Sequence, residues 1–216
     1  MSNDDLVTAV AEELLWDPKL DSESIAVSAD EGVVSLRGAV GSFHEKREAK
    51  KAAERVYGVI EVQNELRVKL MTDSRRDDAD LRADVLQSLA LDSLVPATID
   101  ADVTDGYVIL TGKAEWQYQR DEADYVTAHL LGVIGVENDV ELIGPPPNAG
   151  NVKDGIDRAF KRNAKLDAKD LSVETSDHTV TVNGTVRSWA EHDEAIDAAW
   201  AAPGVRDVKD RLAVLY

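Results

Sequence analysis

Four histidines in this chain could perform acid–base or metal chemistry. His44, His129, His178 and His192 could transfer protons near neutral pH or bind a divalent metal. No two of them are spaced as HxH or HExxH, the patterns in which one strand or one helix presents two ligands to a metal. We therefore expect no metal site and no bound cofactor.

The other residue types that support catalysis lack a recognisable arrangement. Cysteine is absent from the chain, which excludes thiolate catalysis, disulfides and cysteine-ligated zinc. Serine, histidine and aspartate are present, but no nucleophile-elbow motif surrounds any serine. An enzyme is therefore the least expected class of function.

Glycines at fixed spacing are the most regular feature of the sequence. The blocks GVVSLRG, GYVILTG and HTVTVNG each end in a glycine, and 20 residues later a second glycine opens the pattern G-V-x-x-V-x-[N/D]. The six glycines are Gly38, Gly112 and Gly184, then Gly58, Gly132 and Gly204. The chain therefore consists of three copies of one small unit.

These glycines have a structural and a functional interpretation. A glycine in a strand makes room for a packed helix or a bulge, whereas a ligand-binding glycine lets a backbone approach a phosphate. No GxGxxG or GxxxxGK pattern surrounds them, which favours the structural role. Gly58 and its equivalents are expected to end a helix in the left-handed conformation.

Aromatic residues gather just before the second helix of each copy: Phe43, Trp116, Tyr118 and Trp189. They could staple the start of the helix to its own core. Alternatively, Trp116, Tyr118 and Trp189 could contact a phospholipid surface or a protein partner.

The second helix of the first copy is basic, unlike its counterparts. Lys46, Arg47 and Lys50 could bind an acidic surface, including the middle copy of another molecule, so self-association is a further expectation. Pairing along this helix is expected to be poor, since Lys51 and Arg55 repel each other. In the third copy, the acidic set Glu191, Asp193, Glu194 and Asp197 is interpreted as a solvated helix face.

The elements that must position these residues follow from hydrophobic periodicity. Each copy opens with an amphipathic helix, continues with a hairpin of two alternating strands, and ends with a second helix and a last strand. Ser42 with Glu45, and Ser188 with Glu191, form capping boxes at the start of the second helix. The fold class is α+β: three tandem α-β-β-α-β domains, each a three-stranded mixed sheet with two helices on one face.

The predicted domains span residues 1–70, 80–143 and 151–216. Residues 71–79 form a charged linker between the first two. Residues 144–150 form a proline-rich linker, in which 144–148 are expected to be a stiff polyproline spacer.

Net charge excludes one class of partner. The chain carries 24 basic and 42 acidic residues, a net charge of −18. The middle copy (residues 80–144) holds 13 acidic and 3 basic residues, so it alone contributes −10. We expect no nucleic-acid binding, because such binding needs a basic surface. The amino-terminal sequence does not resemble a signal peptide, so the chain as written is expected to be cytoplasmic, or periplasmic if an export signal is missing from it.

The repeated Gly-x-V-x-L-x-G block, the alanine-bearing helix and the G-V-x-x-V-x-N pattern together resemble the BON domain. His178 departs from this pattern, because Gly32 and Gly106 occupy the same turn position in the other copies. The resemblance implies a non-catalytic binding module associated with osmotic or envelope stress. Several BON proteins contact phospholipid, some are cytoplasmic and potassium-linked, and the two-copy osmotic-stress members are periplasmic.

We therefore expect a binding or scaffolding protein whose partner is a protein or a membrane phospholipid surface. Association with phospholipid is one alternative, although the net charge of −18 opposes it at anionic surfaces. A cytoplasmic potassium-responsive protein is the second alternative.

Overall fold

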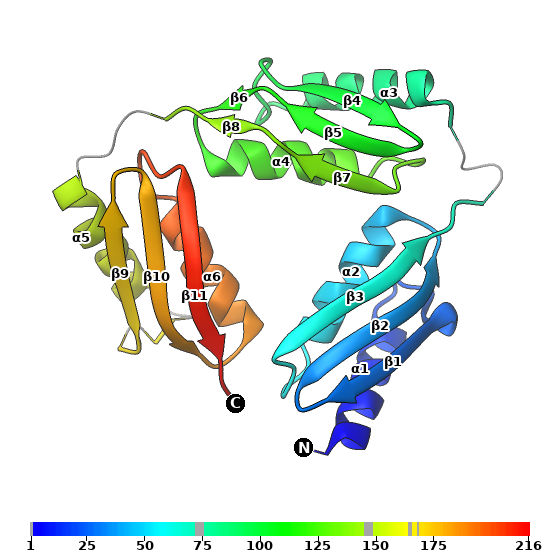
Figure 1. The fold of residues 1–216 in the computed structure, drawn as a ribbon, viewed down its shortest axis with the longest axis horizontal. Helices are drawn as coiled ribbons and strands as arrows, with labels where there is room; N and C mark the ends of the chain where they lie inside the picture. The colour runs from blue at the N-terminus through cyan, green and yellow to red at the C-terminus, as the bar shows by residue number, and fades with distance from the viewer. Residues whose placement is uncertain (1, 72–75, 145–148, 164–165, 168) are drawn as a thin grey trace. The chain divides into compact units, whose positions relative to one another are not determined.

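The order of elements expected from the sequence occurs three times along the chain (Figure 1). The computed structural model describes residues 2–71, 76–144, 149–163, 166–167 and 169–216. Residues 72–75 of the charged linker and 145–148 of the proline-rich linker lie outside the described residues, and so does the predicted polyproline spacer. The α+β fold class is confirmed.

The first repeat contains α1 (Asn3–Trp16), a 3₁₀ turn η1 (Ser22–Ser24), β1 (Ile25–Asp30), β2 (Val33–Val40), α2 (Phe43–Glu54) and β3 (Glu61–Val68). The sheet order is β1-β2-β3. β1 pairs with β2 antiparallel through a two-residue hairpin. β3 pairs with β2 in parallel because α2 carries the chain back to the same end of the sheet.

The third repeat has the same topology. It consists of α5 (Ala149–Arg162), β9 (Leu171–Ser176), β10 (Thr179–Val186), α6 (Trp189–Trp200) and β11 (Asp207–Val214). The central strand β10 pairs antiparallel with β9 and parallel with β11.

The middle repeat differs in the continuity of its strands. Its elements are α3 (Asp78–Leu91), β4 (Asp100–Thr104), β5 (Tyr107–Thr111), β6 (Lys113–Ala114), α4 (Gln117–Ala128), β7 (Gly135–Asn138) and β8 (Glu141–Leu142). β4-β5-β7 form one sheet and β6-β8 a short second one. The break falls at Gly112, whose carbonyl still accepts from Glu141 N at 2.9 Å.

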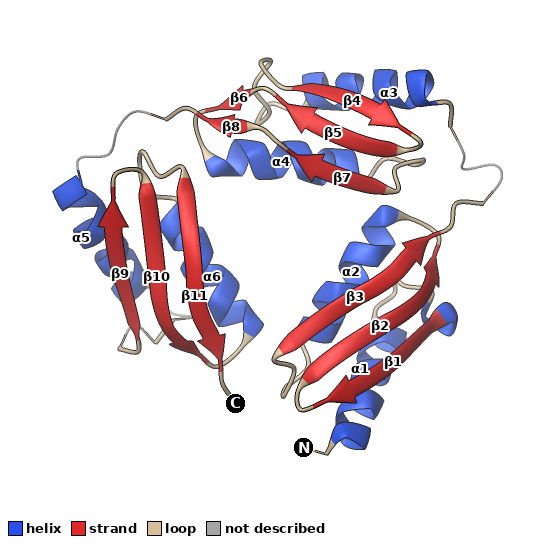
Figure 2. Ribbon diagram, in the orientation of Figure 1, coloured by secondary structure: helices blue, strands red, loops and turns tan. Residues whose placement is uncertain are grey.

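Each repeat buries one face of its sheet beneath its two helices (Figure 2). In the first repeat, Leu6, Val10 and Leu14 of α1 meet Val34 and Leu36 of β2 in one core. Small residues of α2, among them Ala49, Ala52 and Ala53, are fully buried in the same core. Small side chains let the helix lie close to the sheet. The opposite face of each sheet carries no helix of its own repeat.

The hairpin turn of the third repeat differs from that of the first, because His178 replaces a glycine there. Glu31 and Gly32 both adopt positive φ, at 47° and 85°, as a two-residue type I′ hairpin requires. In the third repeat Asp177 keeps a positive φ of 52°, but His178 does not adopt one. The β9–β10 register is nevertheless intact. The histidine therefore changes the turn type and not the pairing of the strands.

Candidate functional site

The three strand glycines are needed where the backbone just before the first strand packs against the central strand. A Cβ on Gly38 would lie 1.9 Å from the carbonyl oxygen of Ser24, and φ at Gly38 is 138°. Gly112 and Gly184 have the same contact, at 2.2 and 2.1 Å from the carbonyl oxygens of Thr98 and Asp170. The space is thus taken by backbone and not by a packed helix, and it is closed to a ligand.

The second set of glycines does not end the helix. α2 ends at Glu54, whereas Gly58 lies four residues further on, in the turn that leads to β3. The expected positive φ is present, at 95°, 103° and 81° for Gly58, Gly132 and Gly204. The helix ends earlier because a tight turn is needed to bring the chain against the hairpin, where Ile60 N donates to Gly32 O at 2.8 Å.

His178 secures the same junction with its side chain. Its Nδ1 lies 2.9 Å from the carbonyl oxygen of Gly204. A carbonyl oxygen only accepts, so Nδ1 carries the hydrogen. In the first repeat Gly32 stands at this position and has no side chain, and a Cβ added to it would lie 3.1 Å from the carbonyl oxygen of Gly58. His178 is therefore a structural residue.

A buried carboxylate at the start of the second helix ties two loops together. Ser42 Oγ accepts from Glu45 N at 3.1 Å, which is one half of the predicted capping box. The reciprocal half differs, because the Glu45 carboxylate bonds the backbone N–H of the residue before the cap and not that of Ser42. Glu45 accepts from Gly41 N at 2.7 Å and from Asp21 N at 2.8 Å, so its reach extends to the loop before β1. Glu191 of the third repeat repeats these contacts with Arg187 N and Asp167 N.

Glu191 was expected on a solvated helix face, and that prediction is wrong. Its side chain is buried, and each of its carboxylate oxygens accepts a hydrogen bond from a backbone N–H. In the middle repeat Gln119 takes this place, and its Oε1 accepts from Glu115 N and Trp116 N.

The last residue of the second landmark connects the final strand to the second helix. Asn64 Nδ2 donates to Lys46 O at 2.7 Å, and Asn64 Oδ1 accepts from Leu66 N. In the third repeat Asp210 replaces the asparagine and has no hydrogen to donate. His192, at the position of Lys46, supplies it: His192 Nε2 lies 2.7 Å from Asp210 Oδ2.

His192 is held among acids and an aromatic ring. Its Nδ1 lies 3.1 Å from Asp193 Oδ1, and its ring centroid lies 4.8 Å from that of Trp189. The hydrogen bond to Asp193, outweighing burial and joined by Asp210, raises the pKa of His192 above its usual value. The side chain is 12% exposed, which places a titrating group at a helix–strand junction.

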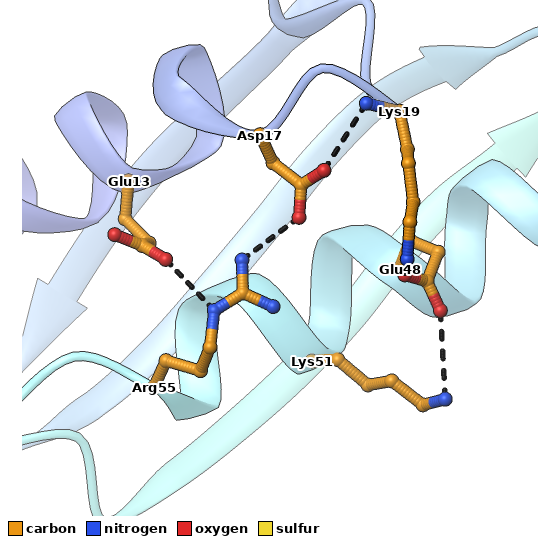
Figure 3. Close-up of polar contacts among 6 residues, drawn as sticks. All are labelled: Glu13, Asp17, Lys19, Glu48, Lys51 and Arg55. Carbon is orange, nitrogen blue, oxygen red and sulfur yellow. Dashed lines mark hydrogen bonds and ion pairs between the residues drawn. The ribbon is translucent and has the colours of Figure 1, made fainter.

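Six charged side chains form an ionic cluster that connects α1 to α2 in the first repeat (Figure 3). The cluster comprises Glu13, Asp17, Lys19, Glu48, Lys51 and Arg55. Arg55 pairs with Glu13 and Asp17, both at 2.8 Å. Lys19 and Lys51 pair with Glu48, at 2.7 and 3.4 Å.

The electrostatics of the cluster favour its charged state. The guanidinium of Arg55 holds the pKa of Asp17 below its usual value. Burial raises the pKa of Glu48, but Lys19 and Lys51 outweigh it, so the net shift is downward. The cluster therefore joins α1 and the residues that follow it to the carboxyl-terminal half of α2.

The basic helix α2 is more fully paired than the sequence suggested. Lys51 and Arg55 belong to the ionic cluster, and Lys50 pairs with Glu54 at 3.4 Å. Arg47 lies over the ring of Phe43, 5.8 Å from its centroid. The expectation of poor pairing is wrong, because acids on α1 and on α2 itself supply the partners. It remains a prediction that an acidic partner binds Lys46, Arg47 and Lys50.

The aromatic residues near the second helices differ in exposure. Tyr118 is 53% exposed, whereas Trp116 and Trp189 are half-buried. Trp116 precedes α4 and its backbone is capped by Gln119. Sequence reasoning missed Trp16, which is 85% exposed at the end of α1. Its position off the buried stripe of Leu6, Val10 and Leu14 was the signal for it.

Among the described residues, no group of three or more histidine, aspartate or glutamate side chains is arranged to hold a metal ion. None of the helices in the described ranges has the length and apolar character to cross a membrane.

A family model described as the BON domain matches residues 2–69, 77–144 and 148–216. The osmotically-inducible protein Y of Escherichia coli (strain K12) is 31% identical over 145 residues, which cover 64% of this chain and 72% of that protein.

Two solved structures of CdsD, a structural protein of the type III secretion system of Chlamydia trachomatis, also match. One is 16% identical, with 98% of this chain and 92% of that chain covered and a TM-score of 0.28. The other, the C-terminal domain, is 15% identical, with both chains fully covered and a TM-score of 0.27. At these TM-scores, nothing about this chain follows from them.

Proposed function

The chain belongs to the BON domain family, and from that membership we propose that it is a non-catalytic binding or scaffolding protein of the osmotic or envelope stress response. Three modules offer several weak contacts, whose combined affinity exceeds that of any single module. The similarity to a protein named as osmotically inducible supports the stress context.

One observation carries the binding role. The residues that all three copies share have structural roles: Gly38, Gly112 and Gly184, for example, allow two backbone segments to pack closely. The exposed positions, by contrast, differ from copy to copy. A chain that repeats a scaffold and varies its surfaces is suited to binding, because each copy can present a different contact surface on the same fold.

The role is tested in the source organism by deleting the gene and measuring growth after a sudden rise in osmolarity. We expect slower recovery, restored by the full chain expressed from a plasmid. A strain that recovers at the normal rate under osmotic and envelope-damaging conditions would contradict the stress role. A turnover that survives purification and disappears with one polar substitution would contradict the non-catalytic class.

Association with a phospholipid surface is the alternative that the exposed aromatic residues favour. Trp16 and Tyr118 are largely exposed, and aromatic side chains partition into the interface of a bilayer. Flotation of the full chain with neutral and anionic liposomes tests it, with Trp116→Ser, Tyr118→Ala and Trp189→Ala variants. Binding that a variant loses supports this role, and no flotation on either surface removes it.

The potassium-responsive alternative is tested with the same purified chain. Thermal unfolding is measured in KCl and in NaCl at equal ionic strength. A melting temperature that rises only in KCl supports this alternative, and identical curves contradict it.

A further inference from the structure

The open face of the middle sheet carries exposed apolar side chains. Tyr107 is 58% exposed and Ile109 is 38% exposed, although both lie on the central strand β5. Val108 and Leu110 point to the opposite side, into the core. The Tyr107 ring and the branched side chain of Ile109 therefore lie on the face of the sheet opposite the core. Figure 2 shows that the helices of this repeat, α3 and α4, cover the other face.

A glycine in the next strand seats the Tyr107 ring. Tyr107 stands opposite Gly135 in the parallel β5–β7 ladder. A Cβ at position 135 would lie 2.6 Å from Cδ1 of the ring and 2.7 Å from Cε1. The ring thus lies over Gly135, in the space that the Cβ of any other residue would need.

Only the middle repeat has this arrangement. Counted from the strand glycine of each copy, the equivalents of Tyr107 and Ile109 are Val33 and Ser35, or Thr179 and Thr181. The equivalents of Gly135 are acidic, Glu61 and Asp207. The aromatic ring and the glycine beneath it occur together in one copy and neither occurs in the other two.

Carboxylates flank the two apolar side chains. Glu137 stands opposite Ile109 on β7, and Asp102 is exposed on β4, the other neighbour of β5. Adjacent strands lie about 5 Å apart, so both carboxylates are within reach of one bound side chain. Asp102 also pairs with Arg82 Nε at 3.7 Å, and the same Nε donates to Ala101 O at 2.7 Å.

This combination is complementary to arginine. A guanidinium group stacks on an aromatic face and pairs with carboxylates at the same time, and it is more weakly hydrated than an ammonium group. The middle repeat contributes −10 of the net charge of −18, so its field attracts cationic segments.

We propose that this face, defined by Asp102, Tyr107, Ile109 and Glu137, binds an arginine-bearing segment of a partner protein. The guanidinium stacks on Tyr107 and pairs with Glu137 or Asp102, while an apolar neighbour covers Ile109. The inference rests on the proposed binding role and adds the surface and the chemistry of the partner.

The test measures fluorescence anisotropy of labelled peptides with the full chain at physiological salt. One peptide alternates arginine with leucine, and two controls of equal charge alternate arginine with glycine or lysine with leucine. We expect the arginine–leucine peptide to bind most tightly. Equal affinity for all three would overturn the proposal, because charge alone would then explain binding.

Variants of the full chain locate the site. Tyr107→Leu keeps Gly135 covered but removes the ring, and we expect an affinity loss of about threefold to tenfold. Glu137→Gln should cost about threefold. Asp80→Asn, an equal charge change on the exposed start of α3, is the matched control and should bind as the parent does. Unchanged affinity in Tyr107→Leu and Glu137→Gln, or an equal loss in Asp80→Asn, would overturn the site.

The two proposals fail separately. The peptide experiment uses purified protein and reports on one surface, whereas the growth experiment reports on the stress role. If the arginine–leucine peptide shows no preference and the deletion strain recovers normally, both proposals are wrong. If the peptide shows no preference but the deletion strain recovers slowly, the binding surface is wrong and the stress role stands.

Discussion

At the scale of single residues, the three copies share the residues that the path of the backbone requires. Gly184 is in this class because the carbonyl oxygen of Asp170 occupies the place of its Cβ. Gly155 lies in helix α5 of the same repeat, and a Cβ added there would have no heavy atom within 4 Å. The same change at the two positions should have opposite effects.

We expect Gly184→Ala to lower the free energy of unfolding of the third repeat by more than about 2 kcal/mol, through the clash and the positive φ. Gly155→Ala should raise it by up to about 1 kcal/mol, because alanine favours the helix. Hydrogen exchange read by mass spectrometry on the full chain assigns both effects to the third repeat. An alanine tolerated at position 184 would contradict the close approach of the Asp170 carbonyl to this position.

His192 makes the stability of the third repeat depend on pH. Because Asp193 and Asp210 raise its pKa in the folded state, its ion pairs contribute fully below the ordinary value of 6.5. The contribution is lost as the pH rises through the folded-state pKa. We expect a loss on the order of 1 kcal/mol from pH 6 to pH 8.

Hydrogen exchange of α6 and β11 as a function of pH checks this loss. Trp189, next to the imidazole, adds a fluorescence signal that should follow the same titration. His192→Gln should remove the dependence on pH in this region. The same slope in the variant would assign the effect to other groups.

At the scale of elements, a buried side chain at the start of the second helix fixes the loop that leads into the first strand. Glu45 and Glu191 use two oxygens for two backbone donors, whereas Gln119 uses one oxygen for both of its donors. The carboxylate reaches a loop more than 20 residues away in the chain, since Asp21 N and Glu45 are 24 residues apart. This contact orients η1 and β1 relative to α2.

Glu45→Gln should therefore lower the stability of the first repeat by about 1 to 2 kcal/mol, because one of the two backbone donors loses its acceptor. Hydrogen exchange at increasing denaturant concentration, read by mass spectrometry on peptides from residues 5–70, measures the change. Glu12→Gln, on the exposed face of α1, removes the same charge and is expected to have little effect. Equal losses in both variants would mean that net charge, and not the contact, is responsible.

Much of the fold follows from the sequence because it depends on local patterns. The periodicity of Leu6, Val10 and Leu14 located α1, and the alternation around Gly38 located β2. What the sequence did not reveal depends on contacts between distant segments. The acceptor role of Glu191 toward Asp167, the partners of Arg55 on α1, and the seat of Tyr107 on Gly135 all join elements whose spacing in the chain carries no local signal.

At the scale of the whole molecule, charge is distributed unevenly among copies of one fold. The third copy holds 12 acidic and 10 basic residues over 151–216, close to balance, whereas the middle copy has a net charge of −10. Like charges on one small domain oppose its compact state, and salt screens them.

We expect salt to stabilise the middle repeat selectively. Raising NaCl to about 0.5 M should slow hydrogen exchange in residues 80–144 by an amount that corresponds to on the order of 1 kcal/mol. Exchange in 151–216 should change less and serves as an internal reference. A uniform response of both repeats would show that self-repulsion in the middle copy is unimportant.

The exchange of Asn64 for Asp210 between the first and third copies has a consequence for how such repeats diverge. Asparagine at this position donates to a helix carbonyl, so an aspartate introduced there alone would set a carboxylate against that oxygen. With a histidine at the position of Lys46, the same aspartate gains a donor. The two substitutions are therefore epistatic, and the path that changes the helix residue first avoids a destabilised intermediate. Recombining segments of the copies would separate such pairs. Duplicated domains of one fold therefore lose the ability to exchange segments as paired substitutions accumulate in each copy.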